Sequence, residues 1–115
     1  MDTATARTRL EAMLCDLDRS IAILKGEHPD PGLSAYDTHP ADAGTNLSDA
    51  DRIEAAVEAM SGQRAAVLAA LRRLEGGTYG ECVNCGNPVP EGRLEARPDA
   101  ARCVLCQAKY DRAHR

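Results

Sequence analysis

The segment from residue 79 to residue 106, YGECVNCGNPVPEGRLEARPDAARCVLC, decides the fold because it contains two CxxC pairs. Cys82 and Cys85 form the first pair, Cys103 and Cys106 form the second, and seventeen residues separate the pairs. One CxxC turn aims two thiolates at a single ion, and two such turns complete the tetrahedron that Zn²⁺ prefers with sulfur ligands. The spacing fits a known zinc pattern of paired CxxC motifs. We therefore predict one zinc ion held by these four cysteines.

Other uses of the two pairs are a redox CxxC motif, an iron–sulfur centre or two disulfides. A single redox motif does not need a second CxxC pair, whereas spacing alone does not separate zinc from a mononuclear iron site. With four thiolates as ligands, no coordination position stays open for water or substrate, so the predicted metal is structural rather than catalytic. Arg93, Arg97 and Arg102 lie between the pairs and either offset the thiolate charge or are solvated.

The composition favours a slim helical architecture over a wide globular core. The 115 residues include no Phe, no Trp and only three Tyr, and aromatic side chains bury the most area per residue. No apolar run reaches the length of a membrane span, and the start of the chain lacks the apolar segment of a signal peptide. We therefore expect a reducing cytoplasm, where clustered cysteines bind metal rather than form disulfides.

Apolar residues upstream of the cysteines recur at alternating steps of four and three. The first set is Leu10, Leu14, Leu17, Ile21 and Leu24, and the second set is Ile53, Val57, Met60, Val67, Leu71 and Leu74, with Arg64 interrupting it. Such heptad stripes are typical of helices that pair along a narrow seam. Thr3 or Thr5 is a candidate first N-cap, and Ser48 is a candidate second N-cap.

The predicted fold is mostly α: an antiparallel coiled-coil hairpin at residues 1–75, then a small four-cysteine zinc-finger module with a short C-terminal helix at 76–115. Prolines and glycines place a tip loop at about residues 26–48. Pairing the stripes about this loop predicts that Leu10 lies near Arg64. The end of the second stripe is then uncovered, so we expect the zinc module to pack against the base of the hairpin.

The charge pattern argues against binding to free DNA. Residues 1–75 carry thirteen acidic and eight basic side chains, and the net charge of the chain is −4, whereas binding to a phosphate backbone needs basic surface. We recognise no catalytic constellation. His39 and Asp42 could form an acid–base couple, but a solvated loop explains them more simply. Cys15 lies beside the seam and is interpreted as a spare thiol.

The whole pattern resembles the DksA/TraR family of bacterial transcription factors. The resemblance rests on Tyr79-Gly80, the two CxxC pairs and the run from Arg93 to Pro98, and it extends to the helix before them, LRRLEGGTYGEC. It implies a protein that binds RNA polymerase rather than DNA, with the coiled coil entering the secondary channel. In the family, the tip of the coiled coil reaches toward the catalytic centre, while the zinc module and the C-terminal helix stay near the rim.

The chain departs from the family pattern at two sites. The tip pattern DxxDxA of the best-known members falls on His39, Asp42 and Gly44, so only the second acid is retained. Basic residues that help those members bind the alarmone guanosine tetraphosphate fall on Ala66, Arg97 and Gln107. Because two of these three cations are missing, the resemblance predicts weak dependence on the alarmone. Arg97 is a candidate contact to polymerase or nucleotide.

Two functions of different classes follow from the sequence. The first is a transcription regulator that binds RNA polymerase. The second is a zinc-finger adaptor that binds another protein through its helices. A hairpin of this kind can also pair with a second copy of itself, so the sequence leaves the oligomeric state open.

Overall fold

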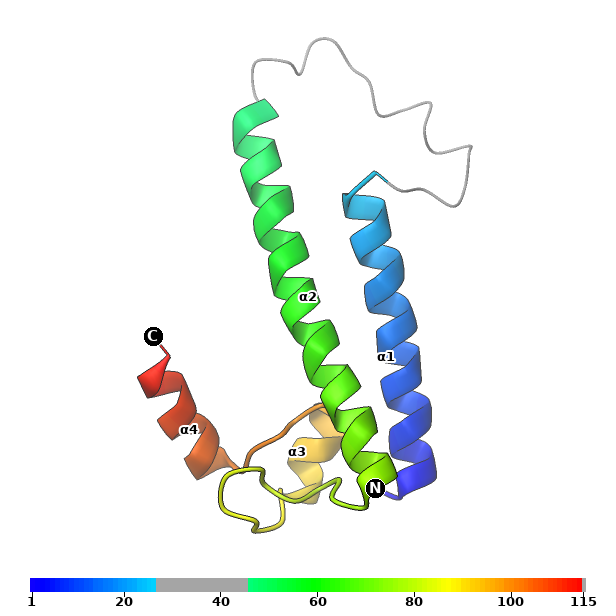
Figure 1. Cartoon of the computed structure of the whole chain (residues 1–115), viewed down its shortest axis with the longest axis vertical. Helices are drawn as coiled ribbons and strands as arrows, with labels where there is room; N and C mark the ends of the chain where they lie inside the picture. Colours follow the sequence, from blue (N-terminus) through cyan, green and yellow to red (C-terminus); the bar gives the residue numbers. More distant parts are fainter. Residues whose placement is uncertain (27–45, 115) are drawn as a thin grey trace. The chain divides into compact units, whose positions relative to one another are not determined.

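The computed structural model describes residues 1–26 and 46–114 (Figure 1). These ranges contain helix α1 (Thr3–Leu24), helix α2 (Asn46–Gly76), helix α3 (Glu91–Ala96) and helix α4 (Val104–Ala113). They contain no strand, only an isolated antiparallel bridge between Glu81 and Pro88. The predicted mostly α fold, two long helices followed by a small cysteine module, is confirmed. None of the described helices is long and apolar enough to cross a membrane.

The chain forms two compact units. The base unit combines Met1–Leu14 with Ala65–Arg115, and the distal unit is Cys15–Arg64. Each long helix contributes to both units. The base unit therefore contains the cysteine module together with one end of α1 and one end of α2, which agrees with the expected packing of the module. The predicted domain boundary between residues 75 and 76 stays a prediction.

Helix α1 begins with a side-chain cap that the sequence pattern did not predict. Asp2 Oδ1 accepts a hydrogen bond from the backbone N–H of Thr5 at 2.6 Å, and Ala6 N donates to Asp2 O at 3.0 Å. The cap is therefore Asp2, and the prediction of Thr3 or Thr5 was wrong, because a carboxylate one residue earlier satisfies a free N–H of the first turn. The Thr5 N–H also lowers the pKa of Asp2, since it favours the charged form.

A glycine lies within two residues after the end of each long helix. At the end of α2, Thr78 N donates to Arg73 O at 2.9 Å and Gly77 N donates to Leu74 O at 3.4 Å. Gly77 has a φ of +79°, a conformation that costs other residues energy. This is the Schellman arrangement, which satisfies carbonyls that the helix leaves free. Helix α1 ends at Leu24, two residues before Gly26, and α2 ends at Gly76, directly before Gly77.

Helix α2 begins two residues before the predicted position. It starts at Asn46, so Ser48 lies in the first turn rather than at the cap. Helix termini extend or fray by a residue or two when several polar residues in a row are compatible with a helix start. The predicted loop at about residues 26–48 is shortened accordingly at its second end, and residues 27–45 lie outside the described part of the chain.

The core of the base unit uses small and large apolar residues from both long helices. Ala6 and Leu10 of α1 and Val67 and Ala70 of α2 are all fully buried. Leu10 and Val67 are the largest fully buried side chains among the described residues. Alanines allow close approach of the two backbones, whereas Leu10 and Val67 supply most of the buried apolar area. This core explains how a chain without Phe or Trp stabilises its base.

A salt bridge in the distal unit corrects the predicted helix register. Arg64 Nε donates to Asp18 Oδ1, so Arg64 lies opposite Asp18 of α1. The prediction that Leu10 lies near Arg64 was wrong. The long connection between the helices does not fix their register, and this register gives the arginine a carboxylate while leaving Leu10 for the core. Because both partners of the pair are exposed, we expect it to contribute little to stability.

The buried core of the base unit predicts an unequal response to two truncations. We expect Leu10→Ala to lower the free energy of unfolding by about 2–5 kcal/mol, because it leaves a cavity among packed residues. The matched control is Ile23→Ala, at a side chain that is 43% exposed, and we expect it to cost less than about 1 kcal/mol. Urea unfolding of the zinc-loaded protein measures both. Equal losses would contradict the assigned core.

Candidate metal centre

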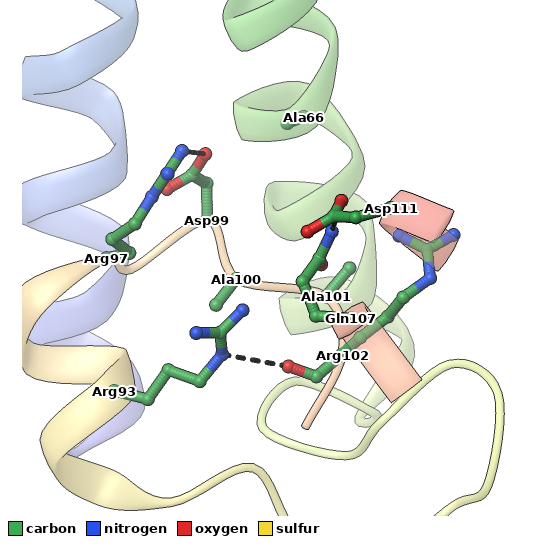
Figure 2. A pocket seen from close by; sticks show the side chains of 9 residues that line it. All are labelled: Ala66, Arg93, Arg97, Asp99, Ala100, Ala101, Arg102, Gln107 and Asp111. Carbon is green, nitrogen blue, oxygen red and sulfur yellow. Dashed lines mark hydrogen bonds and ion pairs between the residues drawn. The ribbon is translucent and has the colours of Figure 1, made fainter. Parts of the chain in front are cut away.

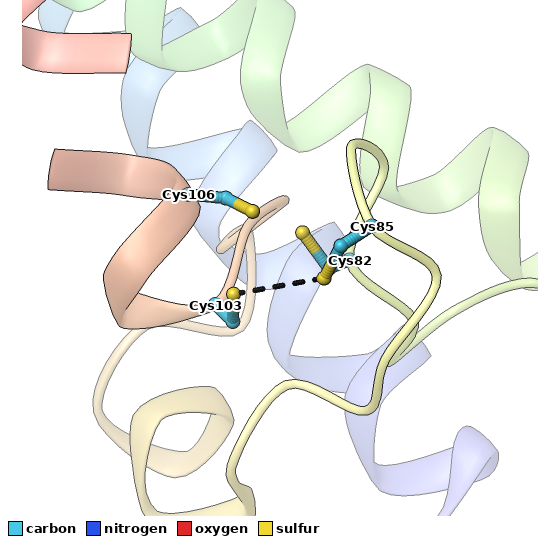
Figure 3. A group of neighbouring side chains, drawn as sticks. All are labelled: Cys82, Cys85, Cys103 and Cys106. Atoms are coloured by element: carbon cyan, nitrogen blue, oxygen red, sulfur yellow. Dashed lines mark hydrogen bonds between the residues drawn. The ribbon is translucent and has the colours of Figure 1, made fainter. Parts of the chain in front are cut away.

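The four predicted ligands meet at one point (Figure 3). The sulfur atoms of Cys82, Cys85, Cys103 and Cys106 all lie within 4.8 Å of one another. The Sγ atoms of Cys85 and Cys103 are 3.9 Å apart. A tetrahedral zinc with Zn–S bonds of about 2.3 Å requires sulfur–sulfur distances of about 3.8 Å. The sulfur set therefore fits a single zinc ion, and the prediction of one structural zinc is confirmed.

The first cysteine pair is carried by a hydrogen-bonded turn. Gly86 N donates to Cys82 O at 2.9 Å, and Cys82 N donates to Asn87 O at 2.8 Å. Gly86 has a φ of +77°, which a residue with a side chain adopts only with strain. The glycine directly after the first CxxC pair thus allows the backbone to curl around the sulfur atoms.

The second pair lies at the start of α4. Cys103 occupies the N-cap position with an extended backbone, and its carbonyl accepts from Gln107 N at 2.9 Å. Cys106 lies in the first turn, so a CxxC at a helix start directs both sulfurs to the same side. The two halves of the centre are joined by a backbone hydrogen bond of 2.9 Å from Val83 N to Ala101 O.

A small apolar cluster packs against the metal centre. Cys82, Val89 and Leu94 are each at most 7% exposed, and Tyr79, Met1 and Ala100 pack against them. Leu94 is the buried residue of α3. Gly80, with a φ of +88°, accepts from Val89 N at 2.7 Å. This cluster holds only a few side chains, so the metal must supply much of the stability of the module.

The backbone that connects the two pairs is fixed by side chains. The hydroxyl of Tyr79 donates to Pro98 O at 2.9 Å, and Arg93 Nε donates to Arg102 O at 3.0 Å. The guanidinium of Arg102 lies 3.9 Å from the centre of the Tyr110 ring. This contact links the segment between the two cysteine pairs to α4. Sequence spacing did not reveal these contacts, although Tyr79 belongs to the quoted family motif.

The thiols of the centre differ in their affinity for protons. The backbone N–H of Cys85 is the main cause that lowers the pKa of Cys82 to about 6, because a donor stabilises a thiolate. Hydrogen bonding with the Cys103 side chain is the main cause that raises the pKa of Cys106 to about 12. Without a cation, therefore, the cluster does not lose all its protons at neutral pH. A divalent ion removes this obstacle.

Arg97 lines a pocket on the same unit (Figure 2). The cavity has a volume of about 490 Å³, and Ala66 of α2 and Gln107 of α4 also line it. The structure thus brings together the three positions that the family resemblance associated with the alarmone. Arg93, Asp99, Arg102 and Asp111 also contribute to the lining.

The other predicted site residues are not part of this centre. His39, Asp42 and Gly44 lie outside the described residues, so their assignment to the tip stays a prediction. Cys15 is exposed on α1 in the distal unit, as expected of a spare thiol.

Comparison with known proteins bears out the resemblance. The profile described as the prokaryotic dksA/traR C4-type zinc finger matches residues 77–112, which include all four cysteines. Residues 77–112 belong to the DksA/TraR family of C4-type zinc fingers. The RNA polymerase-binding transcription factor DksA of Caulobacter vibrioides is 48% identical over 46 residues, which are 40% of this chain and 32% of that protein. General stress protein 16O of Bacillus subtilis is 38% identical over 78 residues, which are 68% of this chain and 48% of that protein.

Two solved structures share the fold over most of the chain. Transcription factor DksA2 from Pseudomonas aeruginosa is 23% identical and aligns with a TM-score of 0.76, over 97% of this chain and 84% of that chain. The DnaK suppressor protein from Agrobacterium tumefaciens is 26% identical, with a TM-score of 0.65 over 95% of this chain and 94% of that chain. By contrast, the chain matches only about a third to a half of the length of the two curated relatives named above.

Removal of one zinc ligand is expected to release the metal. Cys82→Ser leaves three thiolates in a site that needs four, so we expect zinc content to fall from one ion per chain to near zero and the melting temperature to fall. The matched control is Cys15→Ser, which removes an exposed cysteine outside the centre and is expected to retain one zinc. Elemental analysis and thermal unfolding measure both variants. Full zinc occupancy in Cys82→Ser would contradict the ligand assignment.

Zinc affinity is expected to fall as the pH falls. The raised pKa of Cys106, about 12, means that this thiol releases a proton when zinc binds at neutral pH. Each proton that zinc binding releases lowers the affinity about tenfold for each pH unit of acidification, so we expect a fall of at least tenfold per pH unit. Below about pH 6, where Cys82 also becomes protonated, the slope is expected to steepen. Competition with a chromophoric chelator, from about pH 5 to about pH 8, measures this dependence. An affinity independent of pH would contradict this account.

Proposed function

We propose that this chain is a bacterial transcription regulator that binds RNA polymerase through the secondary channel. In this proposal, the tip of the coiled-coil hairpin points toward the catalytic centre, and the chain does not bind DNA sequence-specifically. The observation that carries the proposal is the C4-type zinc finger at residues 77–112, which follows two long helices. A relative with 48% identity in part of its length has a name that describes binding to RNA polymerase.

The chemistry of the metal centre supports a binding function rather than catalysis. Four thiolates fill the tetrahedron around zinc, so no coordination position is left for a substrate. The zinc therefore stabilises a scaffold. Together with a net charge of −4, this favours a protein partner over a nucleic-acid backbone.

Exposed apolar side chains around the centre also support a protein partner. Val83, Val104 and Leu105 lie between the zinc ligands in the sequence and are 48%, 60% and 75% exposed. Helix α4 contains no buried residue. Contiguous exposed apolar patches are typical of protein-binding surfaces, and we propose that these three side chains form part of one. We assign this part of the base unit to contact with the polymerase.

The proposed roles of the remaining residues follow from the family resemblance. His39, Asp42 and Gly44 form the tip, and Asp42 is the residue that we expect to act there. Arg97 is proposed to contact the polymerase or a nucleotide. Alarmone dependence is expected to be weak, because Ala66 and Gln107, which share the pocket with Arg97, carry no charge. Partnership with the polymerase places the chain in the cytoplasm.

Binding to core RNA polymerase tests the proposal directly. We expect the zinc-loaded chain to co-purify with core polymerase and to be displaced by an established secondary-channel factor. If it binds without being displaced, the channel assignment is wrong. If it does not bind polymerase but captures a different protein through its helices, the chain is a zinc-finger adaptor.

The tip is tested by transcription in vitro. Asp42→Asn removes the retained tip acid, and we expect it to abolish most of the effect of the chain on promoter output while polymerase binding persists. The matched control is Asp51→Asn, at an exposed acid on α2, which is expected to behave as the unsubstituted chain. Assays with and without the alarmone should differ little. An unchanged effect of Asp42→Asn on bound polymerase would rule out an active acid at the tip.

A further inference from the structure

The pocket beside Arg97 contains charges of both signs (Figure 2). Arg93, Arg97 and Arg102 line it together with Asp99 and Asp111. Three guanidinium groups around one cavity form a ready site for an anionic group, since arginine binds oxyanions through charge-assisted hydrogen bonds. The two carboxylates oppose such binding, and their surroundings differ.

Asp99 is the unusual member of this set because it is buried. It is only 5% exposed. One carboxylate oxygen, Oδ2, lies 3.5 Å from Arg97 Nη2, and the other, Oδ1, makes no hydrogen bond within the described part of the chain. A buried carboxylate is unfavourable unless a cation compensates its charge. Asp99 therefore requires the positive charge of its neighbours.

Arg97 is the exposed partner of this pair. Its side chain is 65% exposed, whereas that of Asp99 is 4% exposed. The backbone next to Asp99 is also fixed, because Tyr79 donates to Pro98 O. Arg97 can therefore turn toward an incoming ligand, but Asp99 cannot move away from the pocket. A ligand anion that draws Arg97 away breaks the Arg97–Asp99 ion pair, so that the coulombic attraction of Arg73 remains.

The other two arginines each make one contact with the protein. Arg93 donates to Arg102 O, and the guanidinium of Arg102 stacks on Tyr110. Asp111 accepts from Gln107 Nε2 at 2.9 Å and is exposed, so water screens its charge. Among the described residues that line the pocket, Asp99 is thus the buried group whose negative charge opposes the binding of an anion.

We propose that Asp99 is an internal counter-anion that occupies Arg97 and weakens the binding of compact polyanions in this pocket. It competes with a ligand phosphate for the same guanidinium, so it sets which ligands the pocket accepts. The site therefore disfavours ligands that bring negative charge alone. This property belongs to the pocket and holds whether or not the chain binds polymerase.

Binding of inorganic tripolyphosphate to the zinc-loaded full chain tests the proposal by calorimetry. We expect Asp99→Asn, which removes the charge but keeps the shape, to bind tripolyphosphate about tenfold more tightly than the unsubstituted chain. The gain should disappear in Asp99→Asn combined with Arg97→Ala, because Arg97 is the group released. The matched control is Asp111→Asn, which removes an equal charge from the same pocket and is expected to change the affinity less than about threefold.

Three outcomes would overturn the proposal: no gain in Asp99→Asn, an equal gain in Asp111→Asn, or a gain that persists without Arg97. Zinc content and thermal unfolding establish that each variant is folded. If Asp99→Asn does not retain zinc, Asp99→Ser takes its place, because its small hydroxyl fits the same buried position without charge. The same three comparisons then decide the proposal.

Discussion

Four cysteine sulfurs gathered within 4.8 Å of one another are the constraint on which the structure depends. As thiolates they repel each other, and one divalent cation turns this repulsion into four bonds. Among the described residues, the apolar cluster packed against them has three buried members, Cys82, Val89 and Leu94. The metal therefore fixes the module, and the module shares one compact unit with Met1–Leu14 and with α2 from Ala65 onward. The start of α1 and the end of α2 thus belong to the same compact unit as the zinc site.

The physical arrangement explains how a small chain can support a binding function. A structural zinc replaces the aromatic core that the composition lacks, and buried Leu10 and Val67 complete the base. The apolar residues Val104 and Leu105 then stay exposed on α4 instead of being used for folding. Surfaces of this kind suit a protein partner. The DksA/TraR-type zinc finger at residues 77–112 makes RNA polymerase the partner that we propose.

The sequence predicted the features that depend on local pattern and chemistry. CxxC spacing indicated the metal and its four ligands, and the heptad steps indicated two long helices. Features that depend on long-range packing were missed. The predicted register of the two long helices was wrong because a long loop does not fix it. The Asp18–Arg64 salt bridge shows the actual register. The burial of Asp99 beside Arg97 was also not predicted, since no pattern in the sequence marks a carboxylate as buried. The roles of His39 and Asp42 rest on the family resemblance alone.

The role of the metal as the centre of the base unit is tested most directly by amide hydrogen exchange with and without zinc. In the loaded protein, the amides of Val83 and Val89 donate to Ala101 O and Gly80 O and should be protected. On chelation, we expect both to exchange at rates close to those of an unfolded chain, and exchange along Thr3–Leu14 to rise as the base unit loosens. Protection of Val83 and Val89 that survives complete removal of zinc would contradict the account.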